Sequence, residues 1–197
     1  MLIEHRGSVP VVSASAYVAP TAVISGDVTI GDDARILHGA VVTAENGRVV
    51  IGSRVVVMEN ALVRGRAAHP VSIGDDVLIG PHAHVNGAVI ASEVFIATGA
   101  SLFPGSSVGR GSELRINSVL QVNSRLGEGQ SVPIGWVAVG EPAQMFSPDR
   151  HDEIWAIQRE LDFGGTVYGV SKGSTMRDIM AQQAEFFAAH RDDRVVG

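Results

Sequence analysis

The chain has 197 residues, 45% of them hydrophobic and 18% charged, which suits one domain with a real core and an appendage. Its formal net charge of −6, without a dense run of Lys or Arg, argues against nucleic acid as a partner, and no apolar run approaches the length of a membrane span. The absence of cysteine excludes disulfides, thiolate zinc sites and a cysteine nucleophile. Residues 1–6 lack the apolar stretch of a signal peptide, so a cytoplasmic location is expected by default.

An aliphatic residue recurs every six positions from Val12 to Val132, with interruptions, and a small or β-branched residue usually follows four places later. Ordinary amphipathic strands would alternate with a period of two instead. A six-residue step fits a short strand and a tight corner, with the aliphatic side chains inside and Gly, Asp and Asn at the corners. Three steps close one triangular coil. We therefore predict an all-β repeat fold, a parallel β-helix that covers residues 1–146.

Three irregularities interrupt this repeat. Residues 43–50 and 64–72 are longer than one step, and the step from Val85 to Ile90 is one residue short. Extra residues in a rigid repeat must bulge out of the coil. Breaks of this kind are where binding groups usually lie.

Residues 147–197 are predicted to form a C-terminal α-helical extension. Ser147-Pro148 is typical of an N-cap followed by the first helical residue, and an apolar stripe at Ile154, Ile157 and Leu161 follows it. A Gly-rich link over residues 164–173 then leads to a second helix, expected from Ser174 to about His190. We expect both helices to cap or coat the β-helix, because a bare end coil would offer an unpaired strand edge.

The six-residue pattern resembles the hexapeptide-repeat superfamily, whose coils wind left-handed. Within it, the stretch from Ile24 to Ser107 resembles the γ-class carbonic anhydrases in register, including both bulges and the short step. The matching segments are Ile24-Ser25-Gly26-Asp27, Arg54 to Asn60, Ile73 to Val77, Val85-Asn86-Gly87 and Ala97 to Ala100. The resemblance implies a left-handed parallel β-helix that assembles as a homotrimer.

In the γ-class carbonic anhydrases, three histidines from two adjacent subunits bind zinc, which makes a hydroxide from water. The resemblance places these three ligands at Arg64, Pro81 and Asn86. Arg64 is cationic, Pro81 has no side-chain donor and Asn86 is a poor zinc ligand. The family's Asp is kept at Asp27, whereas its Gln-Asp pair reads Met58-Glu59. Classical hydration of CO₂ is therefore not expected, and zinc is expected only if other residues hold it.

The repeat also predicts which side chains share a face. One outward column should contain Ser25, Thr43, Arg64, Asn86 and Phe103, and a second should contain His38, Glu59, Pro81 and Thr98. In a threefold trimer, the first column of one subunit would face the second column of the next. We therefore predict a polar cleft between subunits, which contains Asp27, His38, Glu59, Arg64, His82, His84 and Asn86.

Four residues of this cleft are candidate catalytic groups: His82, His84, Asp27 and Glu59. Three are candidate substrate-binding groups: Arg64, Asn86 and His38. Arg64 suits a carboxylate held by two parallel hydrogen bonds, or an interface salt bridge. His82 and His84 suit a metal if both point outward from one strand, or an interfacial hydrogen-bonding pair.

Three functions remain open at this stage. The first is a γ-carbonic-anhydrase-like protein that binds or processes a small anionic metabolite at the trimer interface. The second is a coenzyme A-dependent acyltransferase, with acetyl-CoA as the donor and His82 or His84 as the general base. The third is a non-enzymatic trimeric scaffold whose helical tail docks a partner.

Overall fold

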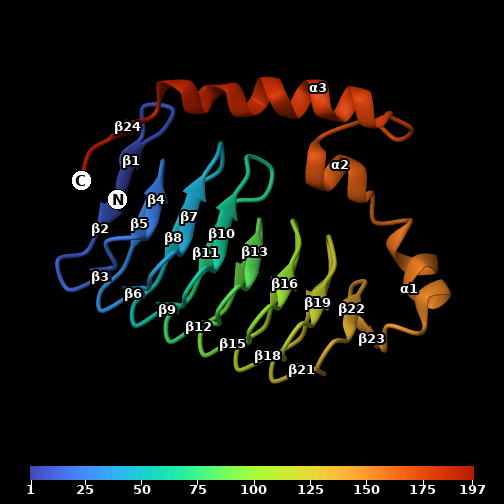
Figure 1. The fold of residues 1–197 in the computed structure, drawn as a ribbon. Coiled ribbons are helices and arrows are strands. Elements are labelled where there is room, and N and C mark those ends of the chain that lie inside the picture. Colours follow the sequence, from blue (N-terminus) through green and yellow to red (C-terminus); the bar gives the residue numbers. More distant parts are fainter.

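The computed structural model describes all 197 residues. The chain forms a left-handed parallel β-helix of about eight coils, which is followed by short helices (Figure 1). Each coil gives one short strand to each of three sheets that form the sides of a triangular prism. The predicted fold class is therefore confirmed, and both bulges leave the coils where the repeat is interrupted.

The strands are short and are grouped here by sheet. The first sheet contains β1 (Leu2–Glu4), β4 (Val23–Ser25), β7 (Val41–Ala44), β10 (Leu62–Gly65), β13 (His84–Asn86), β16 (Ser101–Leu102), β19 (Val119–Leu120), β22 (Val137–Val139), β23 (Gln144–Phe146) and β24 (Arg194–Val195). The second contains β2 (Val11–Val12), β5 (Val28–Ile30), β8 (Val49–Ile51), β11 (Val71–Ile73), β14 (Val89–Ile90), β17 (Ser107–Val108) and β20 (Arg125–Leu126). The third contains β3 (Tyr17–Val18), β6 (Arg35–Ile36), β9 (Val56–Val57), β12 (Leu78–Ile79), β15 (Phe95–Ile96), β18 (Glu113–Leu114) and β21 (Ser131–Val132).

The aliphatic positions of the repeat fill the interior. They form one cluster of 34 buried residues that runs from Ala19 to Ala138. Parallel pairing keeps equivalent positions in register, so that Ile79 lies between Val57 and Ile96 in the third sheet. Each buried Val, Leu or Ile side chain contributes about 1.5–3 kcal/mol through the hydrophobic effect, and the alanines contribute less. Stacked ladders of small aliphatic residues therefore stabilise a core that contains almost no aromatic rings.

The C-terminal segment closes both ends of the first sheet and coats its outer face. At one end β23 pairs with β22, and at the other β24 pairs with β1, both antiparallel. Between these strands lie α1 (His151–Gln158), α2 (Phe163–Tyr168), α3 (Met176–Phe187) and the 3-10 helix η1 (Ala188–Asp192). Helix α3 runs back along the first sheet towards the first coil (Figure 1). None of these helices has the length and apolar character needed to cross a bilayer.

Two details of the tail differ from the sequence prediction. Helix α1 begins at His151 and not at Pro148, because the Arg150 N–H bonds the Ser147 carbonyl in a turn before the helix, at 3.0 Å. The Gly-rich link contains α2, whose start is capped by the Asp162 carboxylate accepting from the Gly165 N–H at 3.2 Å. Burial of Val167 offsets the poor helix propensity of the glycines.

Helix α3 begins with a capping box. Thr175 Oγ1 accepts from the Asp178 N–H at 3.3 Å, and the Asp178 carboxylate accepts from the Thr175 N–H at 3.0 Å. Thr175→Ala should remove about 1 kcal/mol of helix stability, which hydrogen exchange of the α3 amides would detect as about fivefold faster exchange. Arg177→Ala, an exposed change in the same turn, should not speed exchange. Equal exchange in the two variants would contradict the role of the box.

Candidate functional site

The first predicted column lies in register on the outer side of the first sheet. Arg64 is paired with Thr43 on one side and with Asn86 on the other, and Thr43 is paired with Ser25. Ser25, Thr43 and Asn86 are at most 5% exposed in this single chain. Such burial needs no second subunit, because α2 and α3 of the same chain lie over this column.

A cavity of about 620 Å³ lies between the first sheet and these two helices. Its floor carries the polar side chains of Arg64, Arg66, His84 and Asn86. Its walls include four aromatic rings: Phe103, Phe163, Tyr168 and Phe187. The Phe163 ring lies 5.7 Å from the Phe103 ring and 6.2 Å from the Tyr168 ring, centroid to centroid, so these three rings form one connected part of the wall.

Two polar atoms of the floor are buried without a hydrogen-bond partner, Arg64 Nε and Asn86 Oδ1. The nearest carboxylate oxygen to Arg64 Nε is Glu45 Oε1, at 3.9 Å, which is too far for a hydrogen bond. A buried polar group without a partner costs about 1–3 kcal/mol. A ligand that accepts from Arg64 and donates to Asn86 would recover this cost.

His84 gives the cavity a group that can accept a proton. Burial is the main cause that lowers the pKa of His84, and the neighbouring Arg64 cation lowers it further. The imidazole is therefore neutral at pH 7. Its ring meets the edge of Phe103 with centroids 6.1 Å apart, which holds the imidazole against the aromatic wall. Arg66, whose pKa is also lowered by burial and by Arg64, stays cationic because an arginine titrates far above neutrality.

The second predicted column lies at the corner where the strands of the first sheet begin, whereas Arg64 and Asn86 lie where those strands end. His38, Glu59 and Pro81 follow one another up this corner, through backbone hydrogen bonds of 3.0–3.1 Å from each coil to the next. His38 is exposed, and its Nδ1 lies 2.8 Å from Thr21 Oγ1. One chain thus keeps the two columns apart, and their meeting across a trimer interface stays a prediction.

The remaining candidates are also separate from the cavity. Asp27 is exposed after β4, with its carboxylate 3.7 Å from Arg48 Nε. His82 is exposed at the corner before β13, with a positive φ of 57°. His84 is the first residue of β13, so the strand begins after His82. The two histidines therefore do not both point outward from one strand, and the geometry on which the His82 and His84 metal pair was predicted is absent.

The three positions to which the resemblance assigns zinc do not fit that metal. Arg64 and Asn86 are neighbours in register, but they offer a cation and an amide oxygen. Pro81 has no donor atom at all. We derive no chemical step through zinc at these positions.

Several site residues escaped the sequence analysis. Glu45 and Arg66 lie in the two bulges. The sequence predicts that these segments leave the coils, but it does not single out either residue. The aromatic residues of α2 and α3 gave no signal, because nothing in the tail repeats with the six-residue period.

Comparison with protein-family models finds none that matches. Among curated proteins, the chain is 37% identical to γ-carbonic anhydrase 1 of Arabidopsis thaliana mitochondria over 99 residues, which are 47% of this chain and 36% of that protein. It is 29% identical to a carbonic anhydrase of Geobacillus kaustophilus over 100 residues, 51% and 55% of the two chains. It is 32% identical to a probable carbonic anhydrase of Methanocaldococcus jannaschii over 91 residues, 46% and 57% of the two chains.

The chain thus spans between 36% and 57% of the length of these curated relatives. Among solved structures, a UDP-N-acetylglucosamine acyltransferase of Bacteroides fragilis has a TM-score of 0.54 at 17% identity, over 90% of this chain and 89% of that one. At that identity the likeness shows the fold alone. The chain is therefore similar to γ-carbonic anhydrases over about half of its length, within a β-helix that is consistent with the hexapeptide-repeat superfamily.

Proposed function

We propose that this protein binds a small organic anion with an apolar or aromatic body in the cavity between the first sheet and helices α2 and α3. The observation that carries the proposal is the unpaired, buried Nε of Arg64 at the floor of that cavity. A guanidinium binds a carboxylate through two parallel hydrogen bonds, and burial strengthens such charge-assisted bonds.

The other lining residues support this class of ligand. Arg66 adds a second positive charge beside Arg64, and Asn86 Oδ1 offers an acceptor to a hydroxyl or amide of the ligand. The aromatic wall suits an apolar body. A volume of about 620 Å³ lies within the usual range of small-molecule sites.

His84 gives the cavity a possible chemical role beyond binding. As a neutral imidazole beside the anion site, it supports proton abstraction from the bound ligand. The same base would serve acyl transfer from acetyl-CoA, which is the second candidate function. Consumption of acetyl-CoA that is lost in His84→Ala but not in His82→Ala would favour the acyltransferase.

Arg64→Ala should weaken the binding of an aromatic carboxylate at least tenfold, because it removes a charge-assisted contact of about 1.5–3 kcal/mol. The probe pair is 2-naphthoate and its neutral counterpart 2-naphthamide, titrated by ligand fluorescence or calorimetry. The unmodified protein should prefer the carboxylate, and Arg64→Ala should remove that preference.

Arg54→Ala is the matched control, because Arg54 is exposed and paired with Asp76 at a corner of the third sheet, outside the cavity. Its affinity for 2-naphthoate should equal that of the unmodified protein. If 2-naphthoate binds no more tightly than 2-naphthamide, or if Arg64→Ala binds both as the unmodified protein does, the proposal is wrong.

A further inference from the structure

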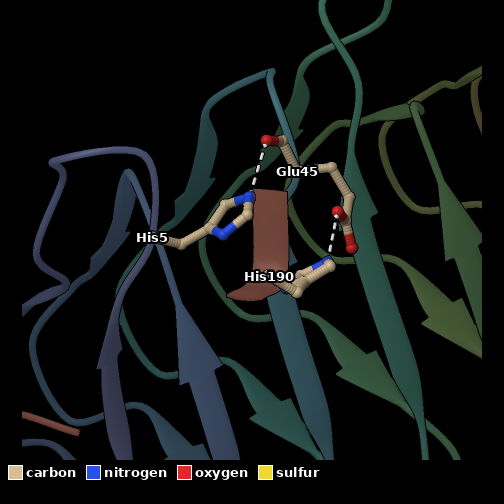
Figure 2. Close-up of side chains that lie close together, drawn as sticks. All are labelled: His5, Glu45 and His190. Carbon is tan, nitrogen blue, oxygen red and sulfur yellow. Dashed lines mark hydrogen bonds and ion pairs between the residues drawn. The ribbon is translucent and has the colours of Figure 1, made fainter. Parts of the chain in front are cut away.

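Two histidines and the Glu45 carboxylate meet where the tail returns to the first coils (Figure 2), and a second carboxylate, Asp193, contacts both histidines. His5 follows β1, Glu45 follows β7 in the first bulge, His190 belongs to η1, and Asp193 follows η1. His5 and Glu45 are at most 4% exposed, whereas the side chain of His190 is 37% exposed. None of these four residues lines the Arg64 cavity.

The Asp193 carboxylate contacts the Nδ1 atom of both histidines and thereby orients both imidazole rings. His5 Nδ1 lies 2.6 Å from Asp193 Oδ1, and His190 Nδ1 lies 2.8 Å from Asp193 Oδ2. The two rings are stacked with centroids 4.4 Å apart. A carboxylate that accepts from Nδ1 fixes the ring and leaves Nε2 as the nitrogen that faces the other way, the arrangement found behind histidines that bind metals.

Both Nε2 atoms face Glu45. His190 Nε2 lies 3.0 Å from Glu45 Oε2, and His5 Nε2 lies 3.1 Å from the Glu45 carbonyl oxygen. The other carboxylate oxygen, Oε1, accepts from Thr43 Oγ1 at 3.2 Å. Glu45 is therefore held through Oε1, presents Oε2 to His190 and presents its carbonyl oxygen to His5 (Figure 2).

We propose that His5 Nε2, His190 Nε2 and Glu45 Oε2 form a binding site for a divalent transition metal such as Zn²⁺, with Asp193 as the carboxylate that orients both imidazoles. Two histidines and one carboxylate are a common ligand set for this class of metal, and they leave a further coordination position for water. The site differs from Arg64, Pro81 and Asn86 in every ligand and goes beyond the anion binding proposed above.

The spacing of the ligand atoms predicts what the metal would do to the tail. One donor atom from each of the three residues lies within 4.8 Å of the others, whereas the ligands of a tetrahedral zinc ion lie about 3.3–3.5 Å apart. His5 and Glu45 are buried in the coils, so the adjustment falls on η1 with the more exposed His190. The metal would therefore draw the tail against the β-helix. It would also release two protons, the one that His190 Nε2 donates to Glu45 Oε2 and the one that His5 Nε2 donates to the Glu45 carbonyl oxygen.

A small pocket reaches this site, and the charges of the surrounding residues suit a cation. His5 and Glu45 line a small pocket of about 260 Å³ that also contains Asp27. Glu45 and Asp193 supply two negative charges. Arg6 and Arg48 also line this pocket, but Arg6 donates to the Phe186 carbonyl at 3.1 Å and Arg48 Nε lies 3.7 Å from the Asp27 carboxylate. Arg64 Nε approaches Glu45 Oε1, not the Oε2 that faces His190.

The test uses the full chain with its affinity tag removed and its metals stripped by a chelator. Titration with Zn²⁺ should give one equivalent per chain with a Kd below about 10 μM, and Co²⁺ should give the visible absorption of a site with nitrogen ligands. His190→Ala should weaken Zn²⁺ binding at least 100-fold, and Asp193→Asn by about 10–100-fold, because it acts only through the orientation of the rings. Since His190 is partly exposed, its replacement leaves the core intact, and circular dichroism checks this.

The controls are His151→Ala, an exposed histidine at the start of α1, and His82→Ala, which tests the alternative pair of histidines. Both should bind Zn²⁺ as the unmodified protein does. Binding in folded His190→Ala within threefold of the unmodified protein would overturn the proposal, as would less than a tenth of an equivalent of Zn²⁺ in the unmodified chain. Loss of Zn²⁺ in His82→Ala alone would move the metal to the alternative pair.

Discussion

Ile90→Ala should lower the free energy of unfolding by about 2–5 kcal/mol, the range measured when a large buried aliphatic side chain is cut back to alanine. Ile90 is 2% exposed and stands in register between Ile73 and Val108 in the second sheet. The rigid coils above and below cannot collapse into the space that the change creates. Urea denaturation followed by circular dichroism, at one fixed chain concentration, measures the effect.

The adjacent residue provides the control. Val89 lies in the same strand but points outward and is 52% exposed, so Val89→Ala should change the free energy of unfolding by no more than about 0.5 kcal/mol. Equal destabilisation by the two changes would contradict the inward and outward assignment of the repeat.

That assignment could be predicted because each coil contacts only its neighbours. Spacing along the chain then determines position along the β-helix axis, and the prediction that Arg64 stacks with Thr43 and Asn86 follows from counting residues through the bulges. The inward positions follow from the same count. In most folds such pairs depend on long-range packing that a sequence does not display.

The sequence analysis was least informative at the corners of the coils and in the tail. His82 was placed on a strand with His84, but the corner residue adopts a positive φ that turns the chain. The path of the tail follows no period, so nothing in the sequence brought His190 to His5, 185 positions away along the chain. The clustering of His5, Glu45 and His190 therefore required the three-dimensional structure.

The tail also limits which properties of the γ-class carbonic anhydrases can be expected of this chain. The resemblance to γ-class carbonic anhydrases rests on the stretch from Ile24 to Ser107, which contains Arg64, His84 and Asn86. The opposite wall of the cavity comes from α2 and α3, outside that stretch. A site built from both parts need not keep the activity of relatives that share only the coils.

Truncating two rings of that wall should separate a cavity within one chain from a cleft between subunits. In the double variant Phe163→Ala and Phe187→Ala, the affinity for 2-naphthoate should fall on the order of 100-fold, because the apolar body loses two aromatic contacts worth about 1.5 kcal/mol each.

If the anion instead bound at the corner that carries His38 and Glu59, which do not line this cavity, the affinity would not change. Phe95→Ala, a change of the same kind on the partly exposed β15, should bind 2-naphthoate as the unmodified protein does. Fluorescence titration of the three proteins decides between the two locations. A fall in affinity confined to the double variant would place the ligand under the tail, where Arg64 supplies the charge and the helices supply the apolar wall.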